Sequence, residues 1–224
     1  MFFQSPSCPR AAWPAGVLLA ALLTAACTLT LAGTLAFAAE EPAEPKGGKE
    51  PATKEVEAGD LTLVVPETWE QGEPSSKFRK VQFDVPAVKG DKEPGEYVVF
   101  HFGEGGGGGV QANVQRWIGQ FRADGRKVKV FTGTSKAGKY TLIDLTGTYN
   151  KPEGPPVLQK TTPMPGARML GVVLQNEKGG DYFIKFTGPE KTIAAAAADF
   201  RNSFGGDAKT EKEAKQTEEK PDAP

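Results

Sequence analysis

Alternating apolar and polar residues predict that the middle of the chain is mostly β-sheet. Between residues 78 and 85, for example, Val81, Phe83 and Val85 alternate with polar residues, and Pro86 ends the pattern. Clusters of glycine, proline and polar residues separate the alternating segments, as expected for turns. The seven predicted strands cover residues 61–65, 78–85, 97–102, 127–131, 140–149, 169–175 and 182–187.

Two other segments show the 3.6-residue period of a helix with one apolar side. The first covers 110–123, and the second begins after Gly188 and Pro189, since proline is favoured at the first helical position. Gly205 is a typical stop for this second helix. Because short turns connect most of the strands, we expect an α+β fold, a mostly antiparallel β-sheet with two packed helices.

The segments that flank this pattern differ from it in composition. Residues 39–58 and 207–224 consist mostly of charged and small residues with prolines among them. They contain too little apolar surface to offset the entropy lost on folding. We therefore predict a disordered linker, a single α+β domain at 59–206 and a disordered charged tail.

Residues 1–38 resemble a signal peptide. Arg10 is the one charged residue before a long apolar run, and Ala36 and Ala38 form an A-x-A cleavage site. We predict cleavage before Ala39 and export to the periplasm or the cell exterior. The alternative is an uncleaved membrane anchor at 11–39, since about 20 apolar residues suffice to span a bilayer.

The arrangement of the elements resembles the PsbP-like superfamily. Pro66 and Trp69 stand in a P-x-x-W spacing, paired strands precede a helix that carries Trp117, and a helix after Gly188 and Pro189 closes the domain. The resemblance covers about 59–206 and implies an α/β/α sandwich. It also implies a protein that binds other proteins and is not an enzyme. It implies no role for any single residue.

A glycine run joins the third strand to the first helix. Gly103, Gly105 and Gly108 have the G-x-G-x-x-G spacing, which can place backbone N–H groups around an anion at a helix N-terminus. A dinucleotide site also needs an acidic residue at the end of the next strand, and 127–131 is not followed by one. A flexible connector is the simpler interpretation, and an anion or small-ligand site is the alternative.

His101 is the only histidine of the chain. A general base needs a partner within hydrogen-bonding reach, and Asp144 is the best candidate for a catalytic pair with His101. The simpler interpretation is a histidine on the surface of the sheet.

Eighteen residues, 150–167, join two predicted strands, far more than the usual two to five of a hairpin. Five prolines limit the freedom of this loop, so docking it onto a partner loses less entropy. Val157, Leu158 and Met164 are apolar and have no evident core partner in the sequence. We predict a partner-binding loop, with a cover over a sheet edge as the alternative.

Composition excludes several other functions. The chain has 27 Lys and Arg residues against 28 Asp and Glu, so no basic field argues for nucleic acid. Both cysteines, Cys8 and Cys27, lie in the leader, and with a single histidine the usual zinc ligand sets cannot form. We expect no cofactor and no metal. The leading hypothesis is an exported, non-catalytic module that binds a protein partner; the alternatives are an anion-binding or small-ligand protein and a hydrolase with His101 as base.

Overall fold

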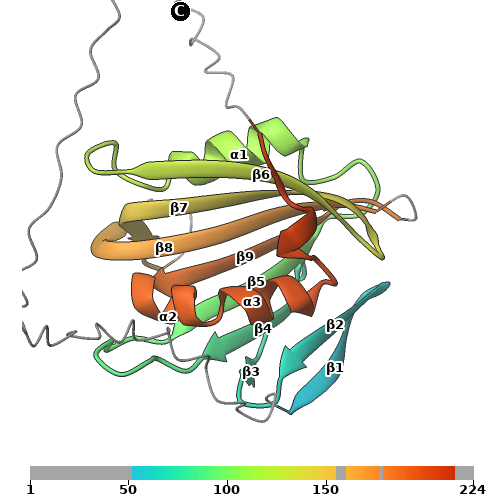
Figure 1. The fold of residues 1–224 in the computed structure, drawn as a ribbon, viewed down its shortest axis with the longest axis horizontal. Helices are drawn as coiled ribbons and strands as arrows, with labels where there is room; N and C mark the ends of the chain where they lie inside the picture. Colours follow the sequence, from blue (N-terminus) through green and yellow to red (C-terminus); the bar gives the residue numbers. More distant parts are fainter. Residues whose placement is uncertain (1–51, 155–159, 177–178, 215–224) are drawn as a thin grey trace, which may run out of the picture. The chain divides into compact units, whose positions relative to one another are not determined.

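The computed structural model describes residues 52–154, 160–176 and 179–214 (Figure 1). The predicted leader, the possible anchor at 11–39 and most of the predicted linker lie outside these residues. Within them, no helix is both long and apolar enough to cross a membrane. The strands are β1 (Thr53–Ala58), β2 (Leu61–Pro66), β3 (Glu70–Gly72), β4 (Arg79–Val85), β5 (Gly95–His101), β6 (Lys127–Ser135), β7 (Gly138–Pro152), β8 (Thr161–Gln175), β9 (Tyr182–Pro189) and β10 (Lys212–Glu213). The helices are α1 (Val110–Ile118), α2 (Glu190–Ala195), α3 (Ala197–Ser203) and the short 3₁₀ helix η2 (Ala208–Thr210).

Eight of these strands form one sheet in the order β10-β6-β7-β8-β9-β5-β4-β3. Every pair of neighbours in it runs antiparallel. The remaining two strands, β1 and β2, pair with each other as a separate hairpin.

The front face of the sheet, the near face in Figure 1, is covered by α2, α3 and the β1–β2 hairpin. Phe83, Tyr97 and Phe186 point from neighbouring strands into this layer. Trp69 packs among them, with its ring centroid 5.1 Å from that of Tyr97 and 5.8 Å from that of Phe186. Phe200 of α3 packs against Tyr97 on the helix side of this cluster.

The back face carries α1, which lies behind the sheet in Figure 1 and packs against β7 and β8. Val114, Trp117 and the following Phe121 are buried there. Gly171 of β8 makes the close approach possible, because a Cβ atom at this position would lie 2.7 Å from the Trp117 ring. The predicted α+β class, with helices on both faces of an antiparallel sheet, is confirmed.

Helix α1 is shorter than the predicted 110–123. The chain turns after Ile118, and the Arg122 N–H donates to the Thr148 carbonyl while the Asn150 N–H donates to the Gln120 carbonyl. Residues 120–122 thus pair with β7, so they cannot continue the helix. The predicted second helix is interrupted at Ala196 and forms α2 and α3.

The ordered domain extends beyond the predicted limits of 59–206 at its beginning. Residues 53–58, which we expected in the disordered linker 39–58, form β1 and pair with β2. Ala58 is fully buried and Val56 packs against the front cluster. The alternation of inward apolar and outward charged residues explains how so charged a segment forms a strand.

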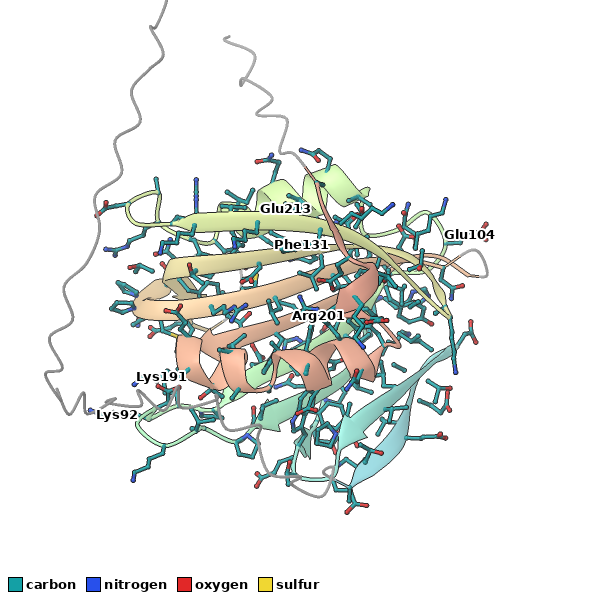
Figure 2. All side chains as sticks on the ribbon, viewed as in Figure 1. Lys92, Glu104, Phe131, Lys191, Arg201 and Glu213 are labelled. Carbon is teal, nitrogen blue, oxygen red and sulfur yellow. The ribbon has the colours of Figure 1, made fainter. Side chains whose placement is uncertain are left out.

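The domain also extends beyond residue 206 at its end. Residues 207–214 of the predicted disordered tail 207–224 form η2 and β10, and Glu213 lies opposite Phe131 of β6 (Figure 2). Arg201 of α3 donates to both carboxylate oxygens of Glu211, at 2.8 and 3.0 Å. This largely buried pair fixes the segment that covers the edge of β6.

Replacement of Glu211 by Gln should lower the free energy of unfolding by about 2–4 kcal/mol, because it leaves the Arg201 guanidinium largely buried without a counter-charge. Glu213→Gln, an exposed position on the same short segment, is the matched control and should change stability by less than about 0.5 kcal/mol. Urea unfolding of both variants measures the difference. Equal losses would show that the Arg201–Glu211 pair does not hold the segment in place.

Candidate functional site

The back face offers a site because α1 packs chiefly over β7 and β8. Strand alternation turns Asp84, Glu96 and Thr187 to this face, since their neighbours Phe83, Tyr97 and Phe186 point to the front. Glu96 lies opposite Asp84 on one side and opposite Thr187 on the other. The three polar side chains therefore stand in one row across β4, β5 and β9.

A cleft of about 320 Å³ opens above this row. Strands β4, β5 and β9 form its floor, the loop before β5 forms one wall and the far ends of β7 and β8 form the other. The residues that line the cleft are Arg79, Asp84, Glu93, Pro94, Glu96, Tyr149, Lys151, Pro152, Met164, Thr187 and Gly188.

Thr187 has an unusual environment in this cleft. Only 6% of the residue is exposed, and its Oγ1 has no hydrogen-bond partner among the residues that the structure describes. The other buried threonine, Thr192, donates from its hydroxyl to Asp91 at 2.7 Å and accepts from the Val88 N–H. Buried polar groups normally have partners, so the Thr187 hydroxyl is an exception within the described part of the chain.

Two ion pairs cross the walls and floor of the cleft. Arg79 Nη1 lies 2.9 Å from Glu96 Oε1, and Lys151 Nζ lies 2.8 Å from Glu93 Oε2. Asp84 has neither a hydrogen bond nor an ion pair within the described part of the chain. The lining residues therefore include three carboxylates and two cations, and one carboxylate is left unpaired.

Lys185 lies two residues before Thr187 on the same face of β9. Its ammonium group donates to Gln120 Oε1 and to the Tyr149 hydroxyl, at 2.8 Å each, and lies over the Tyr149 ring. Burial lowers the pKa of Lys185 to about 8, and the charge of Arg79 adds to this effect while Glu96 opposes it. Burial also raises the pKa of Tyr149 above its ordinary value.

The opposite end of β5 on the back face carries an exposed aromatic patch. Phe78 and Phe102 are 41% and 38% exposed, and their ring centroids are 5.1 Å apart. Phe100 lies two residues before Phe102, on the same face and closer to the cleft. Its ring lies beneath the guanidinium of Arg79. We call Phe78 and Phe102 the aromatic patch.

The predicted glycine loop is more ordered than a flexible connector. Gly103, Gly105 and Gly108 all have positive φ, which explains why glycine occupies these positions. The side-chain amide of Asn113 donates to the carbonyls of residues 107, 108 and 109. Gly107 packs against Phe102 and Phe183. This geometry explains the shape of the loop without a ligand, and an anion site there stays a prediction.

The structure does not bring His101 and Asp144 together. Two strands, β8 and β9, separate β5 from β7 in the sheet. The His101 ring stacks on Tyr182, with centroids 4.4 Å apart, and its Nδ1 lies 3.2 Å from the Asp181 carbonyl oxygen. Asp144 instead accepts two hydrogen bonds from Arg168, at 2.9 and 2.7 Å. The interpretation of His101 as the base of a pair with Asp144 is therefore wrong.

Much of the predicted loop 150–167 continues strands β7 and β8 as a long hairpin. Met164 lies opposite Tyr149, lines the cleft and packs against the back cluster, so the expectation that it has no core partner is wrong. Val157 and Leu158 lie outside the described residues. The hairpin nevertheless forms one wall of the cleft through Lys151, Pro152 and Met164.

Sequence reasoning missed the row of Asp84, Glu96 and Thr187, because Thr187 is 91 residues from Glu96 in the chain and only the strand order brings them together. One signal was present: Lys185 interrupts the otherwise apolar segment 182–186. A charged residue in a central strand must face a polar region, and this one adjoins the cleft. Within the described part of the chain no group of His, Cys, Asp and Glu is placed to hold a metal ion.

No protein-family model and no curated protein matches this sequence. Among solved structures, the Ran-binding protein Mog1p of Saccharomyces cerevisiae is 15% identical, with a TM-score of 0.37 over 67% of this chain and 84% of Mog1p. Cyanobacterial PsbP (CyanoP) from Synechocystis sp. PCC 6803 is 14% identical, with a TM-score of 0.39 over 77% of this chain and 99% of CyanoP. The predicted resemblance to the PsbP-like superfamily is thus a weak likeness of fold.

Replacement of Thr187 by Val should raise the free energy of unfolding by up to about 1 kcal/mol, because it removes a buried hydroxyl that has no partner. Thr192→Val is the matched control and should lower it by about 2 kcal/mol, since Asp91 then loses the hydroxyl donor and the buried-side Val88 N–H loses its acceptor. Urea unfolding measures both. A clear loss of stability for Thr187→Val would mean that the hydroxyl already has a partner in the free protein.

Replacement of Lys185 by Met should change how stability depends on pH. Between pH 8, near the folded pKa of Lys185, and about pH 10.4, the unfolded value, the unfolded chain binds more protons than the folded one. The free energy of unfolding of the wild-type protein should therefore rise by on the order of 2 kcal/mol relative to that of Lys185→Met as the pH rises from about 7 to about 9.5. Unfolding free energies at several pH values measure this gain, and Lys129→Met on exposed β6 should show none.

Proposed function

We propose that the protein is an exported, non-catalytic module that binds a protein partner through the cleft and the aromatic patch. The observation that carries the proposal is the combination, on one face of the sheet, of an exposed aromatic pair and a cleft with an unpartnered buried hydroxyl. Aromatic side chains are enriched at the centres of protein interfaces. Phe78 and Phe102 keep much of their surface exposed, so the pair is available to a partner.

The two features are placed to be used together. Phe102 and Glu96 lie six residues apart along β5 and its immediate continuation, which corresponds to about 20 Å in an extended strand. An extended segment of about six partner residues spans that distance. The segment 150–167, our predicted partner-binding loop, borders the same cleft through Lys151 and Met164.

The proposed location of the protein rests on the leader. The A-x-A site at Ala36–Ala38 supports cleavage before Ala39, after which the charged segment that follows would tether the domain. Mass spectrometry of the protein recovered from its host gives the mature N-terminus. An intact leader would favour the anchored alternative at 11–39.

Chemical cross-linking in the native host, followed by affinity recovery, tests the interaction. The double variant Phe78→Ser, Phe102→Ser should lose the partner that the wild-type protein captures, at least about tenfold by yield, because the patch supplies the apolar contact. Val64→Ser is the matched control: it removes an exposed apolar side chain of similar exposure, 38%, from the β1–β2 hairpin.

Circular dichroism first establishes that both variants fold. A variant with residues 154–160 shortened to a two-residue turn tests the hairpin separately. If the double variant and Val64→Ser capture the partner equally, the aromatic patch is not the binding surface. If no protein is captured in stoichiometric amount by the folded, exported wild-type chain, the proposal of an interaction module fails.

A further inference from the structure

The outer strand of the β1–β2 hairpin has an open edge. Strand β2 lies between β1 and α3, which packs on β2 (Figure 1). In the described part of the chain, β1 pairs with β2 alone. Its open edge runs along all of Thr53–Ala58, without a proline and without a register shift. An edge of this kind is a template for a further strand.

The register of the hairpin determines which backbone groups face this edge. A two-residue turn, 59–60, connects the strands, so Ala58 and Leu61 form a hydrogen-bonded pair, and bonded pairs alternate with non-bonded pairs from there. The Glu67 N–H donates to the Ala52 carbonyl, in agreement with this alternation. The intervening residues therefore direct their N–H and C=O groups away from β2, and these residues are Thr53, Glu55 and Glu57.

These backbone groups are accessible. Thr53, Glu55 and Glu57 are all exposed, and their N–H and C=O groups have no hydrogen-bond partner among the residues that the structure describes. Each residue provides one donor and one acceptor to an incoming strand. Addition of an extended segment to an exposed edge is an established mode of peptide recognition, in which main-chain hydrogen bonds supply the affinity.

The charges of the hairpin favour a basic segment. Glu55 and Glu57 project from the solvent side of β1, and Asp60 and Glu67 lie exposed at the two ends of β2. The one basic residue of 52–67, Lys54, faces inward and donates to the Trp69 carbonyl at 2.9 Å. An added strand places its own side chains beside Glu55 and Glu57, where opposite charges stabilise the pairing.

The same charges select against a second copy of this chain. Two β1 strands paired in register would place Glu55 and Glu57 beside the same residues of the other copy, and like charges in that position destabilise a strand pair. Charged side chains protect natural edge strands from self-association in this way. A basic segment meets no such repulsion, so the edge discriminates between partners by charge.

We propose that β1 accepts an extended, basic segment of a protein partner as a third strand of the hairpin, with lysine or arginine side chains beside Glu55 and Glu57. The alternate side chains of this segment face inward, next to the half-buried Val56, and are apolar. The hairpin covers the front of the main sheet, whereas the cleft and the aromatic patch lie on its back. The inference therefore goes beyond the proposed function and does not depend on it.

A peptide probe tests the added strand directly. A seven-residue peptide of alternating lysine and valine, acetylated and amidated at its ends, is titrated into the full-length, ¹⁵N-labelled protein and followed by two-dimensional NMR. We expect saturable binding and at least about tenfold slower hydrogen exchange at the amides of 55 and 57, because pairing protects N–H groups that face solvent in the free protein. A peptide of the same composition with its lysines in one block should bind about tenfold more weakly, since its charges do not alternate with the faces of a strand. Equal binding of the block peptide would overturn the inference, as would binding without slower exchange at 55 and 57.

Two variants then separate the backbone contribution from the charge. Glu55→Pro removes an outward N–H without removing a bond between β1 and β2, and an edge strand tolerates proline, so it should weaken peptide binding by about tenfold. The double variant Glu55→Lys, Glu57→Lys should lose the lysine peptide by at least about tenfold and bind the corresponding glutamate–valine peptide instead. Glu70→Lys, at an exposed position of β3, is the matched control and should bind as the wild type does. Urea unfolding establishes that each variant folds, and the double variant tests the site even if Glu55→Pro does not fold. Unchanged affinity in either folded test variant would overturn the site.

The variant Phe78→Ser, Phe102→Ser distinguishes this inference from the proposed function. It should bind the lysine–valine peptide as the wild type does, because the aromatic patch lies on the other face of the sheet. If this variant loses the peptide while Glu55→Lys, Glu57→Lys keeps it, the basic segment binds at the aromatic patch and the inference is wrong. If the peptide binds along β1 but the captured partner does not depend on Phe78 and Phe102, the inference stands and the proposed function fails.

Discussion

Each apolar face of the sheet has to be covered, and the chain covers the two faces of this antiparallel sheet unequally. The front face receives α2, α3 and the β1–β2 hairpin, which bury the aromatic cluster around Tyr97 and Phe186. The back face receives the nine residues of α1. These reach β7 and β8, where Trp117 packs into the space that Gly171 leaves. The remaining strands have to meet solvent with side chains of their own.

This inequality determines where polar groups accumulate. Because side chains alternate between the two faces, each of β4, β5 and β9 has an apolar front face. Its back-facing side chains must be solvated or must bond with each other. Arg79, Glu96 and Lys185 meet that requirement by pairing or hydrogen bonding with neighbours. Asp84 meets it by exposure to solvent, whereas the buried Thr187 hydroxyl has no partner in the described part of the chain. The cleft thus lies where the uncovered face is most polar, and Thr187 is the one buried group there that the described structure leaves unpaired.

The interiors of the strands are predictable from sequence because burial of one face imposes a period of two. The pattern of Val81, Phe83 and Val85 fixes both the strand and its orientation. The ends are less predictable. Pro163 and Pro165 indicate a loop, yet they lie in β8, which at this point pairs only with β7. A strand with one open edge tolerates a missing N–H group, and such edges cannot be read from a sequence.

The site was less predictable than the fold for a different reason. A motif in the sequence gathers residues that are near in the chain, such as Gly103, Gly105 and Gly108, whose conformation serves the connection itself. The row across β4, β5 and β9 depends on strand order and register, which no local pattern specifies. A buried threonine also looks ordinary in an apolar strand. Thr187 becomes informative only once its surroundings are known, because stability alone would favour valine at this buried position.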